Sequence, residues 1–236
     1  MKNAFNKKYN IEYLKNNIMI LKNNEIYRVG DMFSFGMPKA VNRLLSDNCF
    51  KNTLLKKYFE KKSLLKINNK TTKLKLFYDI MKKFMIDNKI TVYDDSYLVV
   101  HVRTGDDLKS RGLVKNSNIY LNIIKQYKNK KIVIVTAMHY GNSDLKNKLY
   151  MRKTWLYSDD SKNKNCELLH QLIKQIENPV YLCSNSDVDL DLIKLVFSKN
   201  VKVSSTAGRF AKVVQDLHNL YLNDKKFKIL DEYLIK

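Results

Sequence analysis

From about residue 91 onward, short apolar runs rich in β-branched residues alternate with stretches of helical periodicity. The apolar runs cover residues 97–102, 131–137, 179–185 and 200–205. The helical stretches separate these runs or follow the last one, at about residues 117–128, 161–177, 187–198 and 207–222. Strands that alternate with helices are typical of βαβ units, so the pattern predicts an α/β fold with a parallel sheet.

The first third of the chain has a different pattern. Helical spacing predominates there, in residues 1–24, 38–46, 51–66 and 72–87, and a glycine-containing loop precedes the second of these segments. The change near residue 90 predicts a reduced, mainly helical N-terminal lobe over residues 1–90 and a second domain over residues 91–236.

Polar residues follow the end of each predicted strand. The clusters are His101 to Asp107, His139 to Asn142, Ser184 to Asp191 and Ser204 to Arg209. The carboxyl ends of parallel strands meet at one edge of a sheet, where open α/β proteins bind their ligands. The sequence therefore predicts a functional site at that edge.

The composition and charge narrow the class of partner. The chain has 236 residues, of which 44% are hydrophobic, and its formal net charge is +21. This is a globular composition, and the charge favours a polyanionic partner such as nucleic acid, a membrane surface or a nucleotide-linked substrate. The lysines are scattered among asparagines and apolar residues, so a solvated surface or a coding preference explains the charge equally well.

Several classes of protein are disfavoured. The three cysteines, Cys49, Cys166 and Cys183, lack metal-ligand spacing, and this usage favours a reducing compartment. There is no signal-peptide pattern and no run of about 20 apolar residues, so we expect a cytoplasmic protein without a membrane span. The Walker A, dinucleotide-binding and nucleophile-elbow signatures are missing, which disfavours ATPases, dehydrogenases and α/β-hydrolases.

The segment "HVRTGDD" at residues 101–107 is the first candidate site. Arg103 offers a permanently charged, planar group that suits phosphate or carboxylate, and His101 points to the same side of the strand. Asp106 is placed to orient Arg103 or to hold a hydroxyl. The alternative is a structural Arg–Asp pair at a strand end.

The segment "SSTAGRF" at residues 204–210 is the second candidate. Ser205 and Thr206 come just before a predicted helix, whose free N–H groups and dipole suit a phosphate. Ordinary N-capping by a hydroxyl side chain is the alternative interpretation.

Acidic residues and one histidine complete the set of candidates. Asp187, Asp189 and Asp191 alternate at the start of a predicted helix, where a carboxylate either complements the helix dipole or accepts from a ribose hydroxyl or a guanine edge. A metal site is disfavoured because the EF-hand pattern is absent. His139 follows a predicted strand and is either incidental or part of the site.

Taken in order, these segments resemble the fucosyltransferase superfamily, which includes α1,2-, α1,6- and protein O-fucosyltransferases. "HVRTGDD" resembles the family's His-x-Arg-x-x-Asp segment, and "SSTAGRF" is similar to its turn before a helix. "VYLCSNSDVD" and the upstream "YRVGDMFSFGMPKAV" are similar to two further family segments. Two positions depart from the pattern: Asp31-Met32 replaces an Asn-Gln pair, and Thr104 replaces a second arginine.

The resemblance implies a GT-B-like glycosyltransferase. Residues 91–236 would then form a Rossmann-like, nucleotide-sugar-binding domain with helices on both faces of its sheet. The implied reaction moves a sugar from GDP-fucose or another GDP-sugar to a glycan or protein hydroxyl, without a metal or other cofactor.

The resemblance also assigns roles to residues. Arg103 would grip the β-phosphate of the leaving GDP, His101 would lie beside donor or acceptor, and Asp31 or Asp106 would be the general base. The remaining donor-binding candidates are Gly30, His139, Asp189, Asp191, Ser205, Thr206, Gly208, Arg209 and Phe210.

Two other functions remain open at this point. One is a basic α/β protein whose arginines contact nucleic-acid phosphates: Arg103, Arg111, Arg152 and Arg209. The other is an inactive scaffold that retains a nucleotide pocket.

Overall fold

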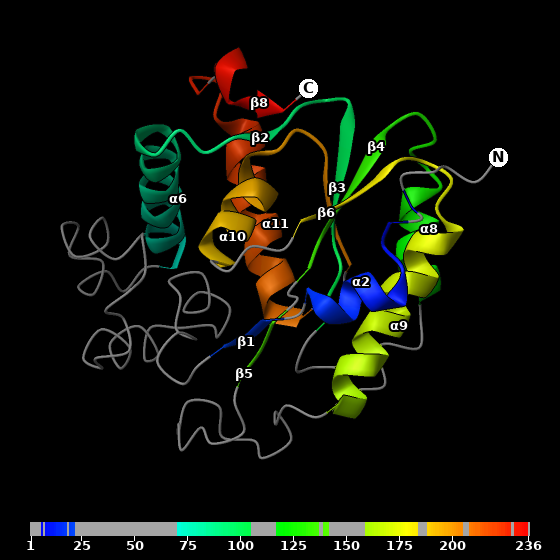
Figure 1. Cartoon of the computed structure of the whole chain (residues 1–236). Helices are drawn as coiled ribbons and strands as arrows, with labels where there is room; N and C mark the ends of the chain where they lie inside the picture. Colours follow the sequence, from blue (N-terminus) through cyan, green and yellow to red (C-terminus); the bar gives the residue numbers. More distant parts are fainter. Residues whose placement is uncertain are drawn as a thin grey trace. The chain divides into compact units, whose positions relative to one another are not determined.

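A computed structural model describes ten parts of the chain, shown as ribbon in Figure 1. They are residues 6, 8–17, 19–21, 70–104, 117–136, 139–141, 159–183, 188–204, 208–227 and 229–235. The chain divides into two compact units, each made of two segments: unit 1 is Met1–Ile26 with Ser96–Ser186, and unit 2 is Tyr27–Asp95 with Asp187–Lys236. This division differs from the single boundary near residue 90, which stays a prediction.

Unit 1 contains a parallel sheet, which confirms the predicted α/β class. Its strands β3 (Tyr97–His101), β4 (Lys131–Val135) and β6 (Val180–Cys183) lie side by side with β4 in the middle (Figure 1). Tyr97 is in register with Lys131, and Ile132 is in register with Val180. All three strands therefore run in the same direction, and their carboxyl ends meet at one edge.

Helices cover one face of this sheet. Side chains alternate along each strand, so Leu98 and Val100 of β3 share a face with Ile132 and Ile134 of β4. These residues form a buried core with α8 (Ser117–Ile124), α9 (Asp159–Gln175) and Leu14 of α2 (Ile11–Asn16). Each large apolar side chain buried in this way stabilises the fold by roughly 1.5–3 kcal/mol.

The predicted helix over residues 1–24 is partly wrong. The helix α2 starts at Ile11, where Asn10 caps it by accepting the N–H of Tyr13 at 2.8 Å, and it ends at Asn16. The next apolar residues form a strand, β1 (Met19–Leu21), which pairs in parallel with β5 (His139–Gly141). The glycine loop and the helices predicted at 38–46 and 51–66 lie outside the described residues.

Two asparagines tie together the amino ends of the strands in unit 1. The Asn178 amide donates to the carbonyl oxygens of Lys128 at 2.6 Å and Lys130 at 2.9 Å. The Asn6 amide donates to Asn178 O at 3.1 Å, and its oxygen accepts the Val180 N–H at 2.9 Å. Segments far apart in sequence are thus joined by side-chain to backbone hydrogen bonds.

Unit 2 is built mainly from helices. It contains α6 (Lys70–Asp87), α10 (Val188–Phe197) and α11 (Gly208–Asn223), with α11 packed against the other two. The strand β2 (Val92–Tyr93) pairs in parallel with β8 (Leu234–Ile235), and β7 (Val201–Val203) precedes α11. These bounds confirm the helices predicted at 72–87, 187–198 and 207–222 to within two residues.

Aromatic side chains and one ion pair hold unit 2 together. Phe197 of α10 is fully buried and packs against Tyr78, Tyr221 and Phe227, with ring centroids 5.5–5.9 Å apart. Asp224 accepts from Lys82 Nζ at 2.8 Å and from the Tyr78 hydroxyl at 3.1 Å. These donors hold the pKa of Asp224 below its usual value, so the carboxylate stays charged. The end of α11 is thereby fixed to α6.

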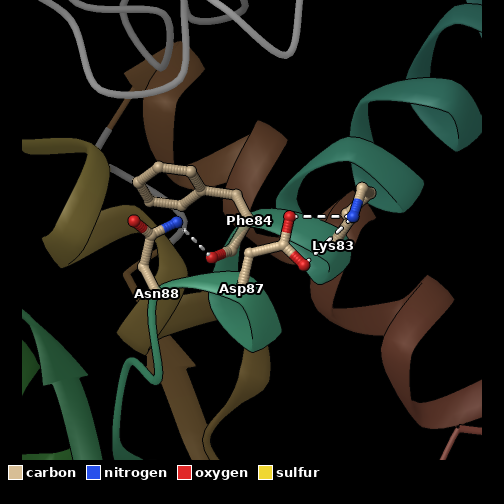
Figure 2. Close-up of polar contacts among 4 residues, drawn as sticks. All are labelled: Lys83, Phe84, Asp87 and Asn88. Carbon is tan, nitrogen blue, oxygen red and sulfur yellow. Dashed lines mark hydrogen bonds and ion pairs between the residues drawn. The ribbon is translucent and has the colours of Figure 1, made fainter.

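The end of α6 is a Schellman motif closed by a residue other than glycine, and Figure 2 shows side-chain contacts of the same helix end. The N–H of Ile90 donates to Met85 O at 3.0 Å and that of Lys89 to Ile86 O at 3.1 Å, while Lys89 has φ 50°. The Asn88 amide donates to Phe84 O at 2.8 Å, and Lys83 reaches both Asp87 oxygens. Lys89 therefore carries a Cβ in the left-handed region, which favours glycine.

A membrane span was not expected from the sequence. Within the described ranges, the chain has no helix that combines the length and the apolar character needed to cross a bilayer.

The Schellman motif predicts that Lys89→Gly stabilises the protein. Glycine removes the Cβ penalty of the left-handed conformation, so the free energy of unfolding should rise by about 0.5–1 kcal/mol. Urea denaturation followed by circular dichroism measures this change. Lys75→Gly is the control, because the same substitution at an exposed interior position of α6 should lower stability by about 1 kcal/mol. Destabilisation by both variants would contradict the account.

The asparagine ties predict that Asn178→Asp is destabilising. The new carboxylate has the same shape but faces carbonyl oxygens that need a donor, so the loss should be about 2 kcal/mol. Asn122→Asp, at an exposed position of α8, is the matched control and should change stability by less than about 0.5 kcal/mol. Equal effects of the two variants would show that the Asn178 contacts contribute nothing specific.

Candidate functional site

The carboxyl edge of the unit 1 sheet is the candidate site. His101, Val135 and Cys183 end their strands in register and form a row across the sheet on one face. This face is opposite to the one on which Leu98 and Val100 meet the helices. His101 is the last residue of β3 and therefore lies at the edge. Arg103 follows two residues later, where the chain leaves the sheet.

His101 is buried and uncharged. Its side chain is only 8% exposed. Burial, followed by the positive charge of Arg103, lowers the pKa of His101 to about 3. At neutral pH the ring is therefore a neutral imidazole, which can make hydrogen bonds but adds no positive charge to the site.

A tyrosine of α8 fixes the backbone at Arg103. The N–H of Arg103 donates to the Tyr120 hydroxyl at 3.2 Å, and the N–H of Val102 donates to Val135 O at 2.9 Å. Burial raises the pKa of the Tyr120 hydroxyl and outweighs the opposing effects of this hydrogen bond and of Arg103. The main chain is thus held for two residues past the end of β3, while the Arg103 side chain is partly exposed.

Two threonines join the exits of neighbouring strands. The Oγ1 atoms of Thr104 and Thr136 lie 2.7 Å apart, and both residues are buried. The N–H of Thr136 also donates to Cys183 O at 3.1 Å. Thr104 occupies the position of the second arginine in the fucosyltransferase-like segment, so this chain has a buried hydroxyl pair where that pattern has a cation.

The structure brings together only some of the predicted site residues. His101 and Arg103 lie at the end of β3, and His139 starts β5, where it is in register with Met19. Asp191 lies in α10 of unit 2 and is 4% exposed. Several candidates are described only by their backbone, in α10 or at the start of α11: Asp189, Gly208, Arg209 and Phe210. The others lie outside the described residues: Gly30, Asp31, Asp106, Ser205 and Thr206.

Sequence reasoning did not single out Tyr120 and Thr136, and it noted Thr104 only as a departure. Thr104 and Thr136 carry a weak signal, since each is a hydroxyl residue just after an apolar run. Tyr120 carries none, because an aromatic residue inside a helical pattern is ordinarily a core residue. Its role at Arg103 depends on how α8 packs against the sheet.

The described residues contain no group of three or more His, Cys, Asp or Glu side chains that could hold a metal ion. Arg103 places a permanent positive charge at the carboxyl edge, just after the end of β3.

Comparison of the chain with family models, curated proteins and solved structures yields no significant match. The likeness to fucosyltransferases therefore depends on the segments quoted above.

The buried, neutral His101 predicts a loss of stability in acid. The unfolded chain binds a proton at this histidine below about pH 6.5, whereas the folded protein does so only near pH 3. The free energy of unfolding should therefore fall as pH drops through this window, by up to about 1.4 kcal/mol per pH unit from this group. Urea denaturation at several pH values measures the slope.

His101→Gln should reduce that slope, because the amide does not titrate. His170→Gln on α9 is the control, because it makes the same substitution at a partly exposed position outside the sheet. His218 is also buried, and its pKa is lowered. It therefore adds to the fall in the free energy of unfolding at low pH, in the wild type and in both variants. An unchanged slope in His101→Gln would contradict the assignment of a neutral His101.

Proposed function

We propose that the protein is a glycosyltransferase of the fucosyltransferase type, which uses a GDP-sugar. The observation that carries this proposal is the pairing of Arg103 with a neutral, buried His101 at the carboxyl edge of a parallel sheet. Open α/β folds bind nucleotides at that edge. His101 and Arg103 are separated by one residue, as are the histidine and arginine of the fucosyltransferases' His-x-Arg-x-x-Asp segment.

The proposed reaction needs charge stabilisation at the leaving group. An acceptor hydroxyl oxygen bonds to the anomeric carbon, while the bond from that carbon to the β-phosphate oxygen breaks and GDP leaves with the electron pair. The hydroxyl proton passes to a carboxylate, for which Asp31 and Asp106 are the candidates. Arg103 would bind the β-phosphate and offset the negative charge that develops on GDP.

The surroundings of Arg103 support this role. The Tyr120 hydroxyl and the Thr104–Thr136 pair fix the main chain on both sides of the arginine. A charged group that is already oriented loses less free energy to reorganisation when phosphate charge develops. The neutral His101 adds no positive charge of its own beside the guanidinium and supplies a hydrogen-bonding ring next to the sugar or the acceptor.

Calorimetric titration with GDP and with GDP-fucose tests the proposal, with UDP as the comparison nucleotide and with a chelator present. We expect binding that is selective for GDP, survives chelation, and weakens roughly 10- to 100-fold in Arg103→Ala. Arg103→Lys should recover only part of the affinity, because lysine lacks the planar pair of donors.

The matched control is Lys174→Ala, which removes an exposed cation from α9 of the same unit. It should bind GDP as the wild type does. Failure of the wild-type protein to bind GDP or GDP-fucose would overturn the proposed function. Binding without sugar transfer to any glycan or protein acceptor would instead favour an inactive nucleotide-binding scaffold.

A further inference from the structure

A group of lysines lies at the amino edge of the unit 1 sheet, at the end opposite to the candidate site. Four of them lie in residues 125–131, which follow α8 and include the first residue of β4. The fifth precedes α2. These amino-edge lysines are Lys8, Lys125, Lys128, Lys130 and Lys131. Lys8, Lys125 and Lys128 are exposed, and the other two are partly exposed.

Hydrogen bonds bring the segments that carry these lysines together. Asn178 donates to the carbonyl oxygens of Lys128 and Lys130, and Asn6, two residues before Lys8, donates to the carbonyl oxygen of Asn178. The turn is closed further by the Lys130 N–H, which donates to Tyr127 O at 3.2 Å. The positive charges are therefore carried on a fixed backbone and do not belong to a freely moving tail.

The charge in these segments is almost all of one sign. Among the described residues of the three segments 6–9, 125–131 and 176–180, the one acidic side chain is Glu177. Five lysines against one carboxylate give a local excess of positive charge within the unit. Such a surface attracts polyanions over a distance set by the ionic strength.

The aromatic rings near these lysines are mostly covered by the protein itself. Tyr9 and Tyr97 are buried, and Lys8 Nζ and Lys131 Nζ lie 4.9 Å and 4.8 Å from their ring centroids. Tyr127 packs against the core. Proteins that bind single-stranded nucleic acid present several exposed rings on which bases stack, whereas the exposed ring beside Lys8 is that of Tyr13, which makes an edge-on contact with Tyr9 at 5.5 Å.

We propose that the amino-edge lysines dock the protein onto an anionic phospholipid surface. All five cations are lysines, which act as mobile point charges on flexible stems and suit headgroups that diffuse in a fluid bilayer. A nucleic-acid duplex holds its phosphates at fixed positions, and proteins fix their register on it with arginine and polar donors as well. The described part of this surface contains no arginine.

This docking leaves the candidate site accessible. Within unit 1, the lysines precede β4 and β6, whereas His101 and Arg103 lie where β3 ends. With the amino edge against the bilayer, the carboxyl edge of the same sheet points away from it. The inference uses no part of the proposed reaction and stands or falls independently of it.

Vesicle flotation tests the docking, with the whole protein and vesicles of phosphatidylcholine alone or mixed in equal parts with phosphatidylserine. We expect binding to the phosphatidylserine vesicles only, and its release by added salt. The triple variant Lys8→Gln, Lys125→Gln, Lys128→Gln should lower the partition coefficient roughly 100-fold, since each lysine near an anionic bilayer contributes about fivefold.

The matched control is Lys75→Gln, Lys212→Gln, Lys226→Gln, which removes three exposed lysines of unit 2 and lowers the net charge by the same amount. It should retain most of the wild-type partition. Equal losses in the two triple variants would overturn the inference, because binding would then follow total charge. A second result would also overturn the inference: the amino-edge lysines bind a DNA or RNA duplex, and the protein does not bind the vesicles.

Discussion

Parallel pairing of β3, β4 and β6 is the constraint on which the arrangement of unit 1 depends. The register places His101 beside Val135 and Val135 beside Cys183, so that all three strands end at one level. A slip of one residue in β3 would turn His101 toward the helices and move Leu98 and Val100 to the opposite face, away from the core that they share with the helices. The apolar core thus fixes the face on which the candidate site is built.

Side-chain hydrogen bonds hold the chain at both edges of the sheet, but the two edges use different chemical groups. At the carboxyl edge the main chain is held past the strand ends by hydroxyl groups, from Tyr120 and from the Thr104–Thr136 pair. At the amino edge it is held by the amides of Asn6 and Asn178. The hydrogen bonds made by Tyr120, Asn6 and Asn178 satisfy backbone groups that would otherwise lack partners where the ladder ends, and the Thr104–Thr136 bond joins the side chains of two neighbouring strand exits.

Much of the fold follows from local pattern. The β-branched runs at residues 97–102, 131–137 and 179–185 predict three parallel strands because such residues suit a sheet that is buried on both faces. The strand at Met19–Leu21 was missed because three residues carry no periodicity, and this strand depends on pairing with a segment more than a hundred residues away in sequence.

The candidate site is predictable only where the chain itself brings residues together. Arg103 comes two residues after His101, the last residue of β3, so the sequence alone places them close together. The contacts of Tyr120 with Arg103 and of Thr136 with Thr104 join segments 17 and 32 residues apart, and they arise from packing that no local pattern encodes. The neutral state of His101 likewise follows from burial and could not be read from its neighbours in sequence.

The most direct test of the central claim is a crystal structure of the protein with GDP bound. The account predicts that the diphosphate lies at the carboxyl edge of the β3–β4–β6 sheet, with its β-phosphate within hydrogen-bonding distance of the Arg103 guanidinium. A diphosphate bound away from Arg103, or at the amino-edge lysines, would contradict it.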